Sequence, residues 1–244
     1  MFKRIRVAIL LYILAFIALG NFLAAARSTD WDETLQAYVD GLTTADFEKI
    51  EAYFSTEARR YGVRLDQPFR LELGPQVDND IPQLASTPSM LDTLLWSLKM
   101  RWFASRIDSG SDRPDPDIKL FALYHEESAG AVLDRSTALE RGLIAVAELF
   151  AGHSSTGANQ IVMAHELLHT LGATDKYDLG TNLPIYPYGY ANPEAHPLYP
   201  QRSAELMAGR VPLDERTAEI PSGLQLTVVG PETAAEIGWP TSPR

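Results

Sequence analysis

Residues 161–175 read IVMAHELLHTLGATD and decide how this chain is expected to fold. The apolar residues at helical spacing predict a helix over Ile161–Leu171, with Asn159 as its cap. Gly172 follows directly and is expected to end the helix, because glycine readily adopts the left-handed conformation of a helix terminus. The sequence therefore predicts a helix that ends in a tight turn at Gly172.

Two histidines lie on one face of this helix. His165 and His169 are four residues apart, so both imidazoles can reach a single metal ion. With Glu166 they form H-E-x-x-H, in which two histidines hold zinc and the glutamate takes a proton from an activated water. Gly172 lets the chain double back, which makes Asp175 a natural third ligand.

The run HELLHTLGATD, residues 165–175, resembles the metzincin metallopeptidases, whose longer motif is H-E-x-x-H-x-x-G-x-x-H. Some members have Asp in the last position, notably the secreted snapalysin type. The continuation DKYD, residues 175–178, is similar to the immune-inhibitor-like peptidases. A later segment, Ala204–Gly209, resembles the methionine turn of metzincins, and Met207 would then lie beneath the zinc-binding histidines. The alternative is that Met207 only fills the core.

The resemblance implies an α+β, zincin-like catalytic domain with a mixed sheet, an active-site helix and a loop-rich carboxy-terminal part. It implies an exported zinc metalloendopeptidase that hydrolyses a peptide or protein substrate. One catalytic Zn²⁺ would be held by His165, His169 and Asp175, and Glu166 would be the general base. Three alternatives stay open: a membrane-tethered binding or assembly protein with a structural zinc site, an accidental motif without metal, and a hydrolase of small amides.

Other polar residues are secondary candidates. Glu194 or Glu205 can replace Asp175 as the third ligand, although the turn at Gly172 favours Asp175. Asp178 is a candidate for Ca²⁺, without further support, or for orienting a metal ligand. The loop 183–200 offers four tyrosines for an oxyanion: Tyr186, Tyr188, Tyr190 and Tyr199. The histidines outside the motif, expected at the surface, are His125, His153 and His196.

The amino-acid composition limits the metal ligands, nucleophiles and partners that the protein can have. The 244 residues contain no cysteine, which excludes disulfides, thiolate zinc sites, iron–sulfur clusters and cysteine nucleophiles. Any metal must therefore be held by histidine and carboxylate. A net charge of -11 without a basic stripe excludes nucleic acid as a partner, because phosphate binding needs a basic face. The oligomeric state is not indicated.

The amino terminus indicates a membrane segment. Val7–Ala26 contains no charged residue and follows the basic stretch Lys3–Arg6. About 20 apolar residues can span a bilayer as a helix, and the preceding cations favour a cytoplasmic amino end. Residues 1–28 are therefore predicted to be a transmembrane signal anchor that exports the rest of the chain. The alternative is a signal peptide cut after Ala26, which would release a secreted protein.

Residues 29–244 are expected to form a single domain, with a helical part at 29–107 and a zinc-site part at 108–244. Helices are predicted at 29–42, 44–60, 90–107 and 231–237, and strands at 69–73, 118–124 and 143–150. The leucine and aromatic stripe of the helix 90–107 is expected to be core.

Overall fold

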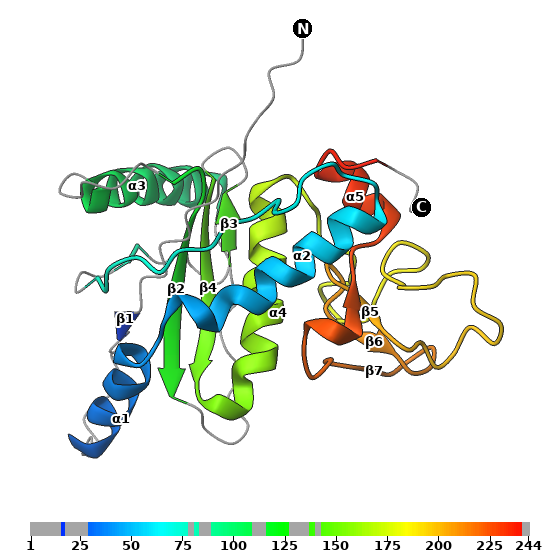
Figure 1. Ribbon diagram of the computed structural model, residues 1–244, viewed down its shortest axis with the longest axis horizontal. Coiled ribbons are helices and arrows are strands. Elements are labelled where there is room, and N and C mark those ends of the chain that lie inside the picture. Colours follow the sequence, from blue (N-terminus) through cyan, green and yellow to red (C-terminus); the bar gives the residue numbers. More distant parts are fainter. Residues whose placement is uncertain are drawn as a thin grey trace, which may run out of the picture.

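The largest sheet among the described residues is mixed. The computed structural model describes residues 16–17, 29–77, 81–82, 89–108, 116–126, 137–139 and 143–240. The strands follow the order β1-β2-β4-β3 (Figure 1), with β1 at Phe16–Ile17, β2 at Lys119–Glu126, β3 at Thr137–Leu139 and β4 at Ile144–Ala151. β1, β2 and β4 are parallel, and β3 is antiparallel to β4 at the edge. The predicted α+β class with a mixed sheet is confirmed.

β2 and β4 divide their side chains between two separate cores. Leu120 and Ala122 belong to one core, whereas Phe121 and Leu123 belong to the other. This follows from the alternation of side chains along a strand, and strands covered on both faces carry continuous apolar runs. The strands predicted at 118–124 and 143–150 are therefore confirmed, with slightly shifted ends.

Helices cover both faces of this sheet. The helices of the described residues are α1 (Thr29–Asp40), α2 (Glu48–Arg60), α3 (Met90–Asp108), α4 (Thr156–Thr170) and α5 (Pro231–Glu236). There are 3-10 turns at Thr44–Phe47, His153–Ser155 and Leu224–Leu226. α1 and α4 contact the sheet and α2 packs on α4, whereas α3 packs on the opposite face (Figure 1). The five predicted helices are confirmed.

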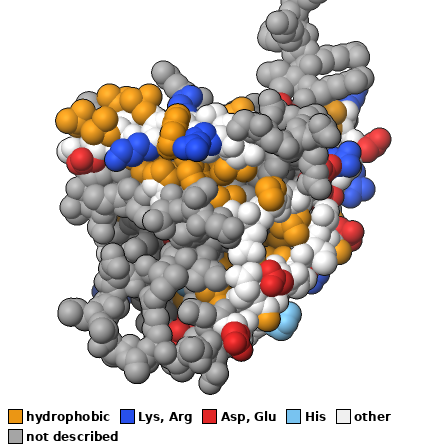
Figure 2. All heavy atoms as spheres, turned by 90° about the vertical axis from the view of Figure 1, so that its left-hand side faces the viewer, with side chains coloured by type: hydrophobic (Ala, Val, Ile, Leu, Met, Phe, Trp, Pro, Cys, Tyr) orange, Lys and Arg blue, Asp and Glu red, His pale blue; other side chains and the backbone are white. Residues whose placement is uncertain are grey.

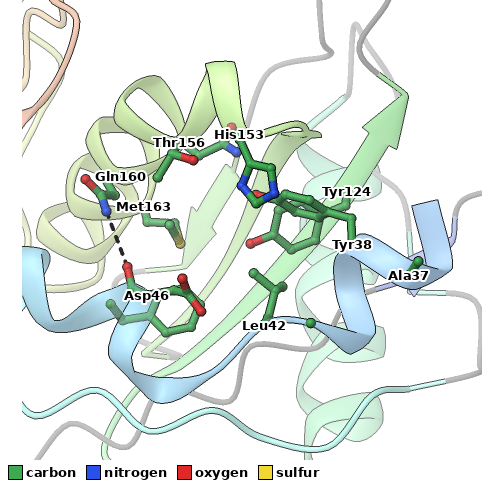
Figure 3. Close-up of a pocket in the computed structure, with 12 residues that line it drawn as sticks. Ala37, Tyr38, Leu42, Asp46, Tyr124, His153, Thr156, Gln160 and Met163 are labelled. Atoms are coloured by element: carbon green, nitrogen blue, oxygen red, sulfur yellow. Dashed lines mark hydrogen bonds between the residues drawn. The ribbon is translucent and has the colours of Figure 1, made fainter. Parts of the chain in front are cut away.

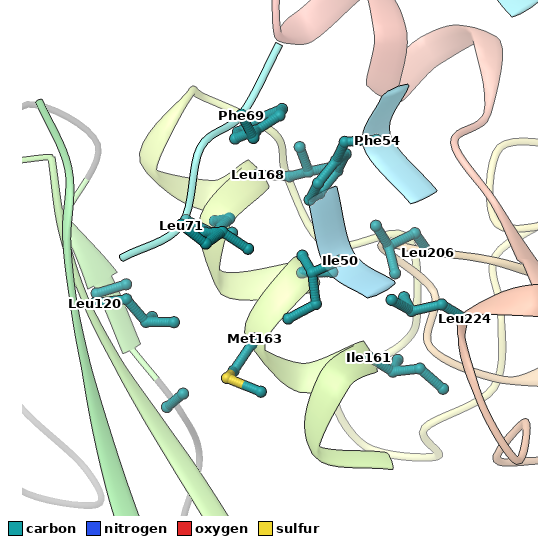
Figure 4. Close-up of a cluster of buried hydrophobic side chains, with 14 of the residues drawn as sticks. Ile50, Phe54, Phe69, Leu71, Leu120, Ile161, Met163, Leu168, Leu206 and Leu224 are labelled. Carbon is teal, nitrogen blue, oxygen red and sulfur yellow. The ribbon is translucent and has the colours of Figure 1, made fainter. Parts of the chain in front are cut away.

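The larger core lies between the sheet, α2 and α4, and extends into the carboxy-terminal part (Figure 4). Its labelled side chains include Ile50 and Phe54 of α2, Met163 and Leu168 of α4, Leu120 of β2, and Leu206 and Leu224. The two parts of the chain that the sequence distinguishes, 29–107 and 108–244, thus contribute to one core.

Residues 172–240 are mostly loop, with short strands in pairs. β5 (Ala204–Glu205) pairs with β8 (Thr227–Val228), and β6 (Val211–Pro212) pairs with β7 (Ala218–Glu219). This loop-rich part covers the side of α4 that carries the histidines.

The strand predicted at Phe69–Leu73 is wrong. Phe69 and Leu71 are buried in the larger core, as their alternation indicates, but no strand forms there. The N–H of Leu71 donates to the carboxylate of Glu51 on α2. A side chain therefore satisfies the backbone group that a neighbouring strand would otherwise pair.

Asn159 is not the cap of α4, which begins three residues earlier at Thr156. Its side chain accepts a hydrogen bond from the Phe150 N–H at 3.1 Å and donates to the Phe150 carbonyl at 2.8 Å. Asn159 therefore ties the first turns of α4 to the end of β4 instead of capping the start of the helix.

The prediction that the apolar stripe of α3 is core is confirmed for one face of the helix and wrong for another. Trp96, Met100 and Phe103 are buried against the sheet. Five other large apolar side chains are exposed: Leu91, Leu94, Leu95, Leu98 and Trp102. α3 is apolar on two faces, and periodicity alone does not say which one is inside.

Of the predicted membrane segment 7–26, only Phe16–Ile17 is described. These two residues form β1, opposite Leu123 and Tyr124 of β2. The remainder of the segment lies outside the described residues. No helix in the described part of the chain has the length and apolar character needed to cross a membrane.

Candidate metal centre

α4 positions the two histidines of the motif. Ala164, Leu167 and Leu168 are fully buried in the larger core. Because they hold one side of the helix there, His165 and His169 lie together on another side, with ring centroids 4.6 Å apart. The predicted arrangement of one face and one turn of separation is confirmed.

The chain reverses at Gly172, as predicted. Its φ of 101° lies in the left-handed region, where an L side chain is strained. The Gly172 N–H donates to the His169 carbonyl at 3.1 Å, and the Ala173 N–H donates to the Leu168 carbonyl at 3.0 Å. These paired bonds form a Schellman motif, which ends the helix and returns the chain toward the histidines.

Asp175 lies at the point where the two imidazoles converge. Its Oδ1 is 3.1 Å from Nε2 of His165 and 3.1 Å from Nε2 of His169. One ligand atom each of His165, Glu166 and His169 also lies within 4.8 Å of the others. The structure therefore brings together all four side chains that the motif singles out.

Backbone carbonyls hold the other nitrogen of each ring. Nδ1 of His165 is 3.1 Å from the Leu206 carbonyl, and Nδ1 of His169 is 2.8 Å from the Ala173 carbonyl. A carbonyl only accepts, so each Nδ1 carries a proton, and each Nε2 faces Asp175. Nε2 either donates a proton to that carboxylate or, in the neutral ring, offers its lone pair to a metal ion. Such carbonyl partners are typical of metal-ligating histidines, so the donor set fits a metal ion.

The charges of the cluster shift the pKa values of its members. Burial by itself lowers the pKa of His165, but the hydrogen bond to Asp175 and the charge of Glu166 outweigh it, so the pKa is raised. Burial by itself raises the pKa of Asp175, but hydrogen bonds from His165 and His169 hold that pKa well below its usual range. Asp175 thus stays ionised between the imidazoles, which favours a cation there.

Glu166 is the buried carboxylate of the site. It is 4% exposed, and its Oε2 has no hydrogen-bond partner among the described residues. Burial raises its pKa, against the lowering effect of His165 and His169. An unpaired buried carboxylate oxygen is costly, and such groups concentrate at functional sites. Its position beside the two rings suits a group that accepts and returns a proton.

The residues on either side of Asp175 are both bound to Glu236 of α5. Lys176 Nζ lies 2.8 and 2.7 Å from the two carboxylate oxygens of Glu236. Thr174 donates to the same carboxylate through its N–H at 3.0 Å and its hydroxyl at 2.7 Å. We call Thr174, Lys176 and Glu236 the Asp175 clamp, because it fixes the backbone around that aspartate. Glu236 was not among the predicted site residues, because it is 60 residues from Lys176 and no local spacing rule reveals such a pair.

The turn Ala204–Gly209 lies against His165, since the Leu206 carbonyl is the partner of its Nδ1. Met207 is fully buried and belongs to the larger core. Its carbonyl accepts from the N–H of Lys176 at 3.0 Å, which joins this turn to the Asp175 clamp. That the Met207 thioether lies beneath the histidines stays a prediction.

The alternative third ligands lie elsewhere. Glu205 is fully buried, and its carboxylate accepts from the Gly230 N–H at 3.0 Å, the Thr233 hydroxyl at 2.7 Å and the Ala208 N–H at 3.0 Å. It therefore holds the start of α5. Glu194 is exposed. Of the three carboxylates that the sequence left open, Asp175 is the one beside the histidines.

The tyrosines of the loop 183–200 are not distinguished as oxyanion partners. The hydroxyls of Tyr190 and Tyr199 bond to each other at 2.7 Å, whereas Tyr186 and Tyr188 are exposed. Tyr177, which the sequence analysis did not propose for this role, places its ring centroid 6.5 Å from that of His165.

Asp178 caps its own turn. Its Oδ1 accepts from the N–H groups of Gly180 and Thr181 and from the Thr181 hydroxyl. These bonds lower its pKa. They account for the residue without calcium, which stays an untested prediction.

The other histidines lie outside the cluster. His125, near the end of β2, pairs with Glu148 in the middle of β4, and His196 is exposed. His153 lines a cavity of about 140 Å³ beside the first half of α4, where it packs against Tyr38 (Figure 3). Gln160 closes this cavity by donating to the Asp46 carbonyl at 3.3 Å.

Comparison with known proteins adds no family assignment. No protein-family model matches the chain, and no curated protein matches it.

Proposed function

We propose that this chain is a zinc-dependent metallopeptidase of metzincin-like design. The observation that carries the proposal is the convergence of His165 Nε2, His169 Nε2 and Asp175 Oδ1, with both Nδ1 atoms bound to carbonyls. Two imidazoles and one carboxylate are a common ligand set for catalytic zinc, which keeps its fourth position open. Other first-row metals accept the same donors, so metal identity is part of the test.

Glu166 supports a hydrolytic role for the site. When bound, zinc would polarise the substrate carbonyl and make water a better nucleophile. The buried Glu166 carboxylate, with Oε2 unpaired, would accept a proton from the attacking water. The water oxygen adds to the carbonyl carbon, the carbon–nitrogen bond breaks, and Glu166 returns the proton to the leaving amine.

The edge strand supports a peptide as the substrate in preference to a small amide. β3 is one of the two edge strands of the sheet in the described part of the chain, and α4 packs next to it. An extended peptide can pair with a strand edge through its backbone, which at β3 would bring a chain alongside the helix that carries Glu166.

The experiment compares the wild-type chain with Glu166→Gln and His169→Ala. Metal content is measured by mass spectrometry of the digested protein for zinc, iron, copper and nickel, and peptidase activity on a mixture of unfolded proteins. We expect one zinc per wild-type chain, zinc without activity in Glu166→Gln, and neither in His169→Ala. Wild-type activity in Glu166→Gln would remove that residue from the mechanism, and a wild-type chain without metal would sink the proposal.

A structural zinc site is the second candidate. The ligand atom of Glu166 lies within 4.8 Å of those of both histidines, so Glu166 can itself be a fourth protein ligand. Structural zinc sites are closed by four such ligands. Loss of zinc from Glu166→Gln would favour this function, because a general base is not needed for binding.

We also propose that the site is exported, with residues 7–26 in the membrane, a state in which Phe16–Ile17 would leave their pairing with β2. The support is the uncharged stretch Val7–Ala26 after Lys3, Arg4 and Arg6. The mass of the amino-terminal peptide from the purified protein distinguishes the membrane-anchored form from the cleaved, secreted form. Cleavage after Ala26 would leave Arg27 as the first residue. A cytosolic protein with an intact amino terminus would overturn the export.

A further inference from the structure

α3 presents an exposed apolar stripe on the face away from the sheet. Its members are Leu91, Leu94, Leu95, Leu98 and Trp102, between 46% and 61% exposed. Their spacings of three and four residues place them on one side of the helix. Contiguous apolar patches of this kind are rare on monomeric soluble proteins and mark interaction surfaces.

Basic residues border the stripe on both sides. At 100° per residue, Lys99 lies roughly 80° to one side of the stripe and Arg101 roughly 80° to the other. Both side chains are exposed, and the Arg106 guanidinium lies 4.7 Å from the centre of the Trp102 ring. Asp92 binds Ser89 in the capping box that starts the helix. The apolar stripe is therefore bordered by cations on a chain whose net charge is -11.

We propose that this face of α3 lies on the surface of an anionic phospholipid bilayer. Leucine and tryptophan would enter the boundary between headgroups and acyl chains, as in helices that lie in the plane of a membrane. Lys99, Arg101 and Arg106 would extend to the phosphates, since long basic side chains keep their charge at the interface. Figure 2 shows hydrophobic side chains beside Lys and Arg at the top of the face that contains α3.

The basic residues favour a bilayer over two other partners that an apolar stripe can bind, namely a second copy of the chain and the segment 7–26. A second copy would bring the same three cations against each other across a two-fold contact. The apolar segment 7–26 has no charged residue to pair with them. Anionic headgroups match the basic borders and the acyl-chain boundary matches the stripe, and the predicted membrane segment of the same chain would hold the protein at a bilayer. The inference does not depend on the metal site.

The absence of cysteine allows a single-site label. Leu98→Cys, in the stripe, carries an environment-sensitive fluorophore. Ile220→Cys is the matched control, because Leu98 and Ile220 are 57% and 59% exposed. Leu98 belongs to α3 and Ile220 directly follows β7, and these two elements lie far apart (Figure 1). Each labelled full-length chain is reconstituted with vesicles of phosphatidylcholine alone or with phosphatidylglycerol. Quenching by aqueous iodide and by a lipid-attached nitroxide is then measured.

We expect the label at position 98, but not at 220, to lose iodide quenching and gain nitroxide quenching in vesicles that contain phosphatidylglycerol. Lys99→Gln and Arg101→Gln should each lower the ratio of docked to free helix about fivefold, the effect of one cation near an anionic surface. Equal iodide quenching at both positions overturns the proposal. Protection from iodide without nitroxide quenching also overturns the proposal, because protein then covers the stripe. If this protection falls when the protein is diluted in lipid, the cover is a second copy of the chain. If it does not fall, the cover is the segment 7–26.

Discussion

α3 and α4 lie on opposite faces of the same sheet, and they differ in what covers their outer side. α4 has the sheet on one side and α2 and the carboxy-terminal loops on others, and its polar residues Asn159 and Gln160 are bound within the fold. α3 packs on the sheet through one face and exposes five large apolar side chains on the other. An apolar helix face is therefore buried or exposed according to whether a further layer of the chain covers it.

The largest expected effect compares one leucine from each helix. Leu168 of α4 is fully buried, whereas Leu98 of α3 is 57% exposed. Leu168→Ala should lower the free energy of unfolding by about 2–5 kcal/mol, because it leaves a cavity. Leu98→Ala should change it by less than about 0.5 kcal/mol. Urea unfolding of both variants measures the difference, and similar losses would mean that the α3 stripe is covered by protein.

The carboxy-terminal part that covers α4 includes the Asp175 clamp, which should affect metal binding. Glu236→Gln removes the charge that binds Lys176 and weakens the Asp175 clamp, so zinc affinity should fall about 10- to 100-fold, as for other residues that orient metal ligands. Glu232→Gln is the matched control, because Glu232 lies on the same helix and is exposed. Competition with a chromophoric chelator measures both affinities. Equal affinities in the two variants would show that the clamp does not position Asp175.

A smaller effect should appear as a pH dependence of the same clamp. Burial by itself raises the pKa of Glu236, but hydrogen bonds from Lys176 and Thr174 outweigh it, so the pKa lies below its ordinary value of 4.5. A carboxylate with a lowered pKa in the folded state stabilises the fold above its ordinary pKa. That contribution is lost as the pH falls through the lowered value.

The difference in unfolding free energy between wild type and Glu236→Gln should therefore be present near neutral pH and shrink below about pH 4.5. Urea titrations of both proteins across this range measure it, and subtraction removes the other titrating groups that the two share. A difference that grows in acid would contradict the assignment.

Much of the site could be predicted from residues 161–175, because its geometry is local. His165 and His169 share a face through helical periodicity, and Gly172 returns the chain within a few residues to Asp175. The Asp175 clamp could not be predicted, because Glu236 reaches Lys176 only through tertiary packing. The Leu206 carbonyl at His165 was not predicted, because the resemblance at Ala204–Gly209 concerned only Met207.

In the fold, too, features set by local sequence could be predicted, and features set by tertiary contacts could not. β2 and β4 were predicted because buried parallel strands carry continuous apolar runs, whereas the segment 69–73 alternates like a strand but finds Glu51 as its partner. Asn159 precedes an apolar run like a cap, yet its amide bonds to Phe150 across space. In both cases the local pattern indicated burial or polarity correctly, but the hydrogen-bond partner lies on another element, 20 residues away for Leu71 and nine residues away for Asn159.

By itself the sequence determined the elements whose physics is local: the helices, the two central strands, the left-handed turn at Gly172 and the shared face of His165 and His169. The absence of cysteine limited any metal to histidine and carboxylate. The tertiary structure decided which carboxylate meets the histidines, since Glu205 is bound at the start of α5 and Glu194 is exposed. It also decided which face of α3 is inside, because burial depends on which layers of the chain meet, and periodicity along a single helix does not contain that information.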